Sequence, residues 1–311
     1  MAINRASISK ELLPGLNAVF GMEYGEVADE HKPLFETENS DRAFEEEVLF
    51  TGFGTAPTKS EGAAVSYDDA QESFTSRYTH ETIALAFAVT EEAMEDNLYD
   101  TFAKLRAKGL ARAMANTKQV KAADVFNNGF NSAFTGGDGQ PFFSASHPTI
   151  GDGNQSNSLG ATDLSEASLE SALITISKLK DDRGILIGGQ TTSLHIPSDL
   201  AFTADQILNS TLSTAVTVNG GNGVTNVNDI NSIRNQGMVP GGFFVNRRFT
   251  DTNAWFLKTD VPNGAKMFVR SPLQTKMEPD FDTGNIRFKA RERYSFGFSD
   301  WRGYFGASGS S

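Results

Sequence analysis

A helical pattern of apolar and small residues, from residue 90 to residue 129, dominates the middle of the chain. Thr90 can cap a helix N-terminus, and acidic residues follow at the positive end of the helix dipole: Glu91, Glu92, Glu95 and Asp96. Asn127, Asn128 and Gly129 suit a left-handed C-terminal cap. Positions spaced by three or four residues form one stripe: Met94, Leu98, Phe102, Leu105, Gly109, Ala113 and Val120. The pattern predicts a single helix about 54 Å long with that stripe buried.

The clearest strand pattern lies between residues 286 and 298. Apolar residues that would share one face of a sheet are Ile286, Phe288, Ala290, Tyr294, Phe296 and Phe298, with Glu292 as an exception. The opposite face would carry Arg287, Lys289, Arg291 and Arg293. We therefore predict a strand with one core face and one basic face. The basic face is compatible with plain solvation, with docking of acidic protein segments, or with nucleic acid.

The first 89 residues offer little material for an independent core. Residues 1 to 43 combine a short amphipathic segment, which Pro14 and Gly15 are expected to interrupt, with acidic, weakly patterned sequence. Strand character is found at residues 44 to 53 and 74 to 89, on either side of a turn region. This arrangement predicts one long β-hairpin that spans residues 44 to 89. Since a lone two-stranded ribbon is marginal in water, this hairpin needs a surface to lie on.

The remaining sequence predicts an α+β unit. Helices are expected at residues 165–182 and from Ser198 onward, the second with an apolar face formed by Leu200, Phe202, Ile207 and Leu208. Strands are expected at residues 191–196, 243–245, 254–257 and 266–269. Two stretches rich in glycine and asparagine, residues 134–160 and 213–232, predict exposed loops.

Composition and charge narrow the class of protein. The chain has no cysteine, which excludes disulfides and thiolate sites and suits a reducing cytoplasm. No apolar run is long enough for a signal peptide or a membrane span, so we expect a soluble intracellular protein. The net charge is −12, with 21 acidic and 6 basic residues in positions 1 to 100 but 18 and 21 in positions 101 to 311. This asymmetry lets the two parts attract one another, and the acidic total argues against tight wrapping by nucleic acid.

Motifs for catalysis or metal binding are absent from the sequence. We find no GxSxG elbow, no GxxxxGK[ST] loop and no complete GxGxxG. The histidines lack metal-ligand spacing, so each is expected to be a surface or packing residue: His31, His80, His147 and His195. We therefore expect no metal and no cofactor.

Two groups of acidic and polar residues have a possible role in ion binding or catalysis, and for each the sequence favours a simpler interpretation. Part of a calcium-loop spacing occurs at Asp152, Asn154, Ser156 and Asp163, but the central glycine is replaced by Asn157. We interpret this stretch as a polar loop, and ion binding in residues 151–158 is left open. The acids at 45 to 47 lie on a predicted exposed hairpin where nothing excludes water, which favours a solvated face over a catalytic pair.

An arm and a hairpin without their own core, joined to a compact body, are typical of a subunit that completes its fold on neighbouring copies. The sequence therefore predicts self-assembly.

Three groups of short motifs run through the chain in order. The first consists of Lys59, Glu61, Gly62, Tyr67, Asp68, Arg77, Tyr78, Val89, Thr90, Glu91, Asp96, Asn97, Leu98 and Tyr99. The second consists of Asn127, Asn128, Gly129, Phe130, Asp138, Gly139, Phe142, His147 and Pro148, and the third of Arg293, Tyr294, Asp300, Trp301, Arg302 and Gly303. Their order and spacing resemble the major capsid proteins of tailed bacteriophages, the second group being similar to Mu-type head subunits. The resemblance covers nearly the whole chain.

The resemblance implies the phage major capsid fold, an α+β fold shared with encapsulin shells and the herpesvirus capsid floor. Residues 1–43 would form an N-terminal arm and residues 44–89 an extended β-hairpin loop. Residues 90–159 and 241–311 would form a peripheral domain containing the spine helix, 90–128, and residues 160–240 an axial domain.

The implied function is structural rather than enzymatic. The chain would self-assemble into the hexamers and pentamers of an icosahedral phage head that encloses double-stranded DNA without reading its sequence. Implied partners are portal, scaffolding and decoration proteins, with no membrane, and assembly would take place in the host cytoplasm.

The charge split suggests how copies meet. In this hypothesis the hairpin acids lie over the basic strand face of an adjacent subunit. The acids are Glu45, Glu46, Glu47, Glu61 and Asp68, and the bases are Arg287, Lys289, Arg291 and Arg293. Lys59 lies near the hairpin tip, where some family members cross-link a lysine to a neighbour's asparagine, but the matching asparagine and the assisting glutamate are not found here.

Two other classes stay open. An encapsulin-like nanocompartment would have the same fold and a protein cargo. A soluble hydrolase with an Asp/Glu pair would need a recognisable motif, and the weakly cored hairpin also argues against it.

Overall fold

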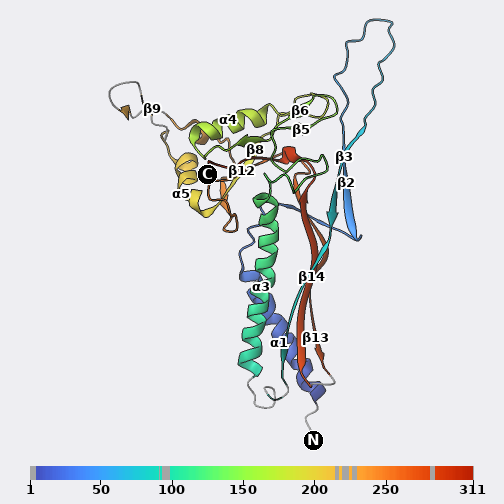
Figure 1. Cartoon of the computed structure of the whole chain (residues 1–311), viewed down its shortest axis with the longest axis vertical. Helices are drawn as coiled ribbons and strands as arrows, with labels where there is room; N and C mark the ends of the chain where they lie inside the picture. The colour runs from blue at the N-terminus through green and yellow to red at the C-terminus, as the bar shows by residue number, and fades with distance from the viewer. Residues whose placement is uncertain are drawn as a thin grey trace.

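The structure is a computed structural model that describes residues 5–90, 92, 99–213, 217–218, 224–225, 230–280 and 284–310. A stalk of long strands and two helices runs along the longest axis, a broader body of short strands and helices lies at one end, and a loop projects beside that body (Figure 1).

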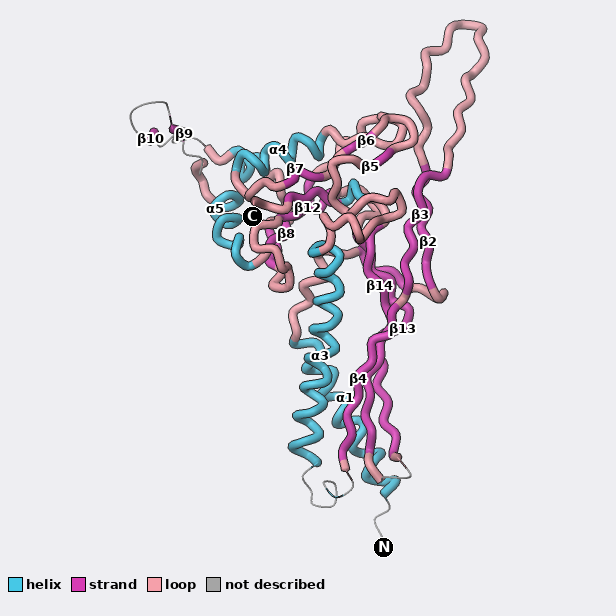
Figure 2. Tube along the Cα trace, in the orientation of Figure 1, coloured by secondary structure: helices cyan, strands magenta, loops and turns pink. Residues whose placement is uncertain are grey.

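The stalk is built on a four-stranded sheet with the order β1-β13-β14-β4. Its strands are β1 (Glu36–Asn39), β13 (Ala265–Pro279), β14 (Ile286–Phe298) and β4 (Glu81–Val89). β14 pairs antiparallel with both β13 and β4, and β1 pairs parallel with β13. Figure 2 shows the helices α1 (Arg5–Glu26) and α3 (Tyr99–Asn127) running alongside these strands.

Strand β14 confirms the alternation predicted for residues 286–298. Phe288 and Ala290 are buried against α1 and α3, whereas the basic residues that alternate with them are exposed: Arg287, Lys289 and Arg291. The strand paired with it is much longer than the predicted segment 266–269. The length of this strand was underestimated because a proline, Pro272, usually argues against a continuous strand. The register shift between Ser271 and Gln274 accommodates the proline.

The N-terminal segment is one helix of 22 residues, so the predicted interruption at Pro14 and Gly15 is wrong. A proline inside a helix removes one backbone hydrogen bond. Leu16 and Phe20, which follow it, are fully buried in the stalk core against α3 and β14. Tertiary packing therefore outweighs the local helix-breaking tendency.

The spine helix exists, but its buried stripe has a different phase from the prediction. Leu105 is 64% exposed and Val120 is 39% exposed. The buried face consists mainly of alanines: Ala103, Ala107, Leu110, Ala111, Met114, Ala115, Ala122, Ala123 and Phe126. Small side chains let α1 and the sheet approach the helix closely. The predicted N-cap acids and the positions Met94 and Leu98 lie at the edge of or outside the described residues, and the side chain of Phe102 is not described.

The predicted hairpin of residues 44–89 is divided in two at His80. β2 (Phe44–Phe50) pairs antiparallel with β3 (Glu72–Thr79), and only these strands form the hairpin. The continuation, β4, belongs to the stalk sheet through its ladder with β14. The return strand therefore serves two sheets, and the part that lies free of the stalk is shorter than predicted.

The broad body contains a five-stranded sheet with the order β11-β8-β12-β15-β7. Its strands are β7 (Ser158–Gly160), β8 (Thr191–Ile196), β11 (Phe243–Val245), β12 (Trp255–Thr259) and β15 (Tyr304–Ala307). The described helices of the body are α4 (Glu166–Ser177), η1 (Ser198–Leu200), α5 (Ala201–Asn209), α6 (Ser232–Gln236) and η2 (Trp301–Gly303). Two small ribbons are β5 (His147–Pro148) with β6 (Asn154–Gln155), and β9 (Thr217–Val218) with β10 (Val224–Thr225).

Two details of the body differ from the sequence interpretation. Ser198 is the first residue of η1 rather than its N-cap, which is Pro197, and α5 starts only at Ala201 without a side-chain cap. Phe202 is 82% exposed, so it does not belong to the apolar face expected for that helix.

An aromatic cluster around Phe126 joins the stalk to the body. The Phe126 ring lies 5.0 Å from that of Tyr304, 5.2 Å from Phe256 and 5.6 Å from Phe142. Since Phe126 lies in the last turn of the spine helix, this cluster fixes the helix axis relative to the five-stranded sheet. No helix within the described ranges is both long and apolar enough to cross a membrane.

Candidate inter-subunit surfaces

The basic strand face predicted from the sequence is present on the outer side of the stalk sheet. Arg287, Lys289 and Arg291 are exposed, and Arg293 is half-buried. Their neighbours on β4 are small, because Ala88, Ala86 and Ala84 lie opposite the first three and Thr82 lies opposite the fourth. The basic side chains therefore stand above a shallow row of small residues at the edge of the sheet.

The other neighbouring strand partly neutralises this face. Lys289 lies opposite Lys276, whereas Arg287 lies opposite Glu278 and forms an ion pair with Asp280. Lys276 also forms an ion pair with Glu278. Within the described part of the face, five basic residues stand against Glu278 and Asp280, so the surface remains positive.

The same sheet face is covered near the body by the chain's own β2–β3 hairpin. The rings of Tyr78 and Phe268 lie 4.8 Å apart, and the Tyr78 hydroxyl lies 2.5 Å from the Ser299 hydroxyl. A Cβ at Gly297 would lie 2.7 Å from the Tyr78 ring, so this close approach requires glycine. The hairpin base is thus packed on the subunit that contains it.

Lys266 connects this contact to the hairpin acids. Its ammonium is buried and donates to Glu47 Oε1 at 2.5 Å and lies 2.9 Å from Glu38 Oε1. Burial alone lowers the pKa of Lys266, but the hydrogen bonds to Glu47 and Glu38 outweigh it and hold the pKa above its ordinary value. Lys266 therefore stays charged.

The predicted interface acids separate into two groups. Glu47 is bound by Lys266 and Ser299, and Asp68 by Arg183 and the backbone of Gly54, so both carboxylates are neutralised within the subunit. The hypothesis that the hairpin acids lie over an adjacent subunit stays a prediction, but these two already have basic partners in their own subunit. Glu45 accepts a hydrogen bond from Ser40 at 2.7 Å, and Glu46 lies 3.8 Å from the Arg77 guanidinium on the exposed hairpin surface.

The end of the hairpin is an exposed loop of residues 52–70 (Figure 1). It contains Lys59 and Glu61, both exposed, next to a turn closed by the bond from Ala63 N to Ser60 O. Its large apolar side chains are uncovered, with Phe53 and Val65 64% exposed and Tyr67 96% exposed. An isolated subunit therefore presents apolar surface on an extended loop, which is typical of an interaction site.

The histidines have packing roles, as expected. All four are buried and hydrogen-bonded: His31 to Gln119, His80 to Ser40 and Ser295, His147 to Asp138 and Asn157, and His195 to Ser193. His147 also stacks on Trp301 at 4.5 Å. Burial lowers the pKa of His31 and of His80. The described residues contain no group of three potential metal ligands.

The residues with calcium-like spacing engage different partners. Asp152 forms an ion pair with Lys180, with 3.1 Å between oxygen and nitrogen, whereas Asp163 accepts a hydrogen bond from Ser310 at 2.6 Å. The structure does not bring these two carboxylates together.

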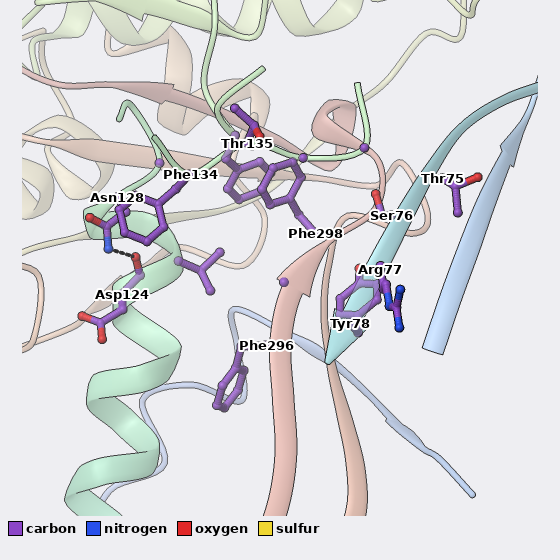
Figure 3. A pocket seen from close by; sticks show the side chains of 16 residues that line it. Thr75, Ser76, Arg77, Tyr78, Asp124, Asn128, Phe134, Thr135, Phe296 and Phe298 are labelled. Atoms are coloured by element: carbon purple, nitrogen blue, oxygen red, sulfur yellow. Dashed lines mark hydrogen bonds between the residues drawn. The ribbon is translucent and has the colours of Figure 1, made fainter. Parts of the chain in front are cut away.

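A cavity of about 420 Å³ lies where the hairpin base, the end of the spine helix and residues 134–137 meet (Figure 3). Tyr78, Phe134 and Phe298 line it, and Asp124 supplies its single carboxylate. A pair of carboxylates, which the hydrolase alternative requires, is absent from this cavity.

Residues 71–306 match the model of a family described as phage capsid protein. The chain therefore belongs to the phage capsid protein family. It is a structural capsid subunit of a virion, and the class of protein implied by the motifs is confirmed. A search of curated proteins finds no match.

Solved structures share the fold along nearly the whole chain. A virus-like particle from Pyrococcus furiosus is 10% identical, with 94% of this chain and 98% of that chain covered and a TM-score of 0.52. The capsid of an empty GTA particle is 12% identical, with 92% and 91% covered and a TM-score of 0.54. The capsid of a native GTA particle is 11% identical, with 92% of both chains covered and a TM-score of 0.54. These similarities confirm the α+β capsid fold.

Proposed function

We propose that this chain forms the hexamers and pentamers of an icosahedral phage head that encloses double-stranded DNA. One observation carries the proposal: a chain of the phage capsid family presents a long loop, residues 52–70, that exposes Phe53, Val65 and Tyr67 and has no core of its own. Such a loop gains a stable position when a neighbouring copy covers it. The protein acts as a building block rather than as an enzyme, and it binds no cofactor.

The parts of the subunit divide this work. Residues 1–43 serve as the N-terminal arm and 44–89 as the extended loop, although β4 within that range is a strand of the stalk. Residues 90–159 and 241–311 form the peripheral domain, and residues 160–240 contribute the axial domain, which faces the symmetry axis of a hexamer or pentamer. Assembly takes place in the host cytoplasm, with portal, scaffolding and decoration proteins as partners.

The basic strand face receives the hairpin of an adjacent copy. Support comes from the positive surface at Arg287, Lys289 and Arg291. On the hairpin, Glu46 and Glu61 are exposed and Glu45 is half-buried. Complementary charges at such a rim select the partner and the register more than they raise affinity. Arg293 and Glu47 lie nearer the hairpin base, where Lys266 and Ser299 already bind the Glu47 carboxylate.

Negative-stain microscopy of the purified chain, expressed alone and with a candidate scaffolding protein, tests the proposal. We expect closed shells that protect DNA from nuclease when the packaging components are present. A chain that stays monomeric in every one of these conditions, as measured by light scattering, would contradict the proposal.

The second candidate is an encapsulin-like compartment that encloses a protein cargo. The similarity to the Pyrococcus furiosus virus-like particle favours it, because that fold match is as extensive as the match to the GTA capsids. The contents of native shells decide between the two: nuclease-protected DNA supports the phage head, and a stoichiometric enzyme supports the compartment.

A further inference from the structure

The extended loop is held to the body at one point near its base. The β2–β3 ladder ends at the pair Phe50 and Glu72, after which Thr51 and Gln71 exchange hydrogen bonds. Beyond this, Asp68 Oδ2 accepts a hydrogen bond from the Gly54 backbone N–H at 2.6 Å, which links the two legs of the loop. Residues 55–67 continue outward and are exposed.

Arg183 of the body binds the same carboxylate. Its Nη2 donates to Asp68 Oδ1 at 2.8 Å and to Oδ2 at 3.0 Å. The Arg183 side chain is 24% exposed and that of Asp68 is 42% exposed, so the pair lies at the surface but is partly covered. Among the ion pairs of the described residues, this one joins the loop of residues 52–70 to the body.

Two glycines allow this close approach. A Cβ at Gly54 would lie 3.1 Å from Asp68 Oδ2 and 3.4 Å from Arg183 Nη2. A Cβ at Gly52 would lie 3.2 Å from a carboxylate oxygen of Asp181. The first leg of the loop therefore passes directly against residues 181–183.

The turn that carries Arg183 is itself rigid. Asp181 Oδ1 accepts hydrogen bonds from the backbone N–H groups of Arg183 and Ile185, each at 2.8 Å. Asp182 is buried and forms an ion pair with the buried Arg302, at 2.6 Å. Arg302 also donates to the carbonyl of Lys180 at 2.8 Å. Consecutive residues, Asp182 and Arg183, thus face opposite ways, one into the body and one toward the loop.

We propose that Arg183 and Asp68 are positioning residues that hold the extended loop in the direction required to reach an adjacent subunit. Arg302 acts one step behind them by fixing the turn through Asp182. The pair orients the loop in the free subunit, so that less conformational entropy is lost when two copies associate. The link to assembly rests on the proposed function, whereas the clamp itself is a property of the single subunit.

Cleavage of the unassembled subunit by a lysine-specific protease tests the clamp. The measured quantity is the initial rate of cleavage after Lys59, assigned by mass spectrometry, because Lys59 lies beyond the clamp in the exposed loop. The variants Arg183→Gln and Asp68→Asn and their combination introduce no lysine. Arg106→Gln, a change at an exposed residue of α3, is the matched control.

We expect each single variant to raise the cleavage rate about fivefold, the size expected for loss of one partly exposed ion pair. The double variant should cleave no more than twofold faster than the faster single variant, because both remove the same interaction. The control should cleave like the wild type, and all variants should melt within about 2 °C of the wild type. A wild-type rate in Arg183→Gln, or fully multiplicative effects in the double variant, would overturn the clamp.

Shell yield under conditions in which the wild type assembles tests the second step. We expect the yield of Arg183→Gln to fall in parallel with the rise in cleavage rate. An unchanged yield would overturn the positioning role in assembly. If the wild type itself forms no shells, the proposed function fails, and the cleavage rates still decide whether the clamp exists.

Discussion

The ammonium group of Lys118 on the spine helix lies 2.6 Å from Oε2 of Glu292 on β14, inside the stalk. The Tyr24 hydroxyl of α1 donates to the same carboxylate oxygen at 3.3 Å and accepts a hydrogen bond from Lys118 at 2.5 Å. Burial and the charge of Glu292 both raise the pKa of Tyr24, so the phenol stays neutral. Glu292, the one charged residue in the apolar face of β14, therefore connects three elements of the stalk.

Replacing this carboxylate should destabilise the subunit strongly. In Glu292→Gln, Lys118 loses its counter-charge in a buried position, and breaking a buried pair from one side costs about 3–5 kcal/mol. Urea unfolding of the unassembled subunit, followed by circular dichroism, measures the change. Glu278→Gln removes a carboxylate from an exposed pair with Lys276 and should leave the unfolding midpoint unchanged. Equal midpoints for the two variants would contradict the structural role of Glu292.

Two glycines are expected to respond to alanine in opposite directions. A Cβ at Gly303 would lie 2.4 Å from the Cα of Gly264, where two backbones cross, so Gly303→Ala should cost about 1–3 kcal/mol through overpacking. A Cβ at Gly109 would meet nothing within 4 Å, and this position is inside the spine helix, so Gly109→Ala should stabilise by about 0.5–1 kcal/mol. Thermal melting of both variants checks the signs. A neutral Gly303→Ala would show that the backbone crossing can relax.

The elements that the sequence predicted best are those whose pattern is local. In β14 the alternation of Phe288 with charged neighbours determines both faces, and the structure has the same faces. The spine helix was predicted for the same reason, but the face that it buries was predicted wrongly. Its buried positions are mostly alanine, which is common on either face of a helix, so exposed Leu105 carried more weight in the pattern than buried Ala107.

Long-range pairing accounts for the rest. The division of the hairpin at His80 depends on the ladder between β4 and β14, some 200 residues away in sequence, with Glu81 opposite Tyr294. The Glu47 carboxylate is neutralised by Lys266, which is 219 residues away in the sequence. Local pattern shows that these acids lie on a strand, but only the tertiary structure shows which of them is already neutralised.

Acid should destabilise the subunit partly through His195. Burial first, and then the charge of Lys258, lower the pKa of this histidine to about 3. In the unfolded chain it titrates near 6.5, so between pH 6.5 and 3 the unfolded state binds more protons. Stability is therefore fully present above pH 6.5 and declines as pH falls, by about 1.4 kcal/mol per pH unit from this group.

The variant His195→Gln isolates that contribution. At pH 7 it should be less stable than the wild type, because it disturbs the hydrogen bond to Ser193 and the stacking on Phe244. Its deficit should shrink as pH falls below 6.5, since glutamine does not titrate. Urea unfolding at several pH values from 7.5 to 4.5 measures the difference. Parallel stability curves for the two proteins would exclude His195 as a source of the acid sensitivity.

Reversing the basic strand face should prevent shell formation without unfolding the subunit. The residues to be changed to glutamate are Arg287, Lys289 and Arg291, which are exposed and lie opposite the core face of β14. Because exposed charges contribute little to folding, circular dichroism should remain that of the wild type. Like charges would then meet across the interface, and shells should be absent from negative-stain images. Arg287→Lys with Arg291→Lys keeps the positive charge and should still assemble. Wild-type assembly should also weaken as salt increases, since screening shortens the attraction between exposed charges. Normal shells from the reversed variant would show that this face does not lie in the interface.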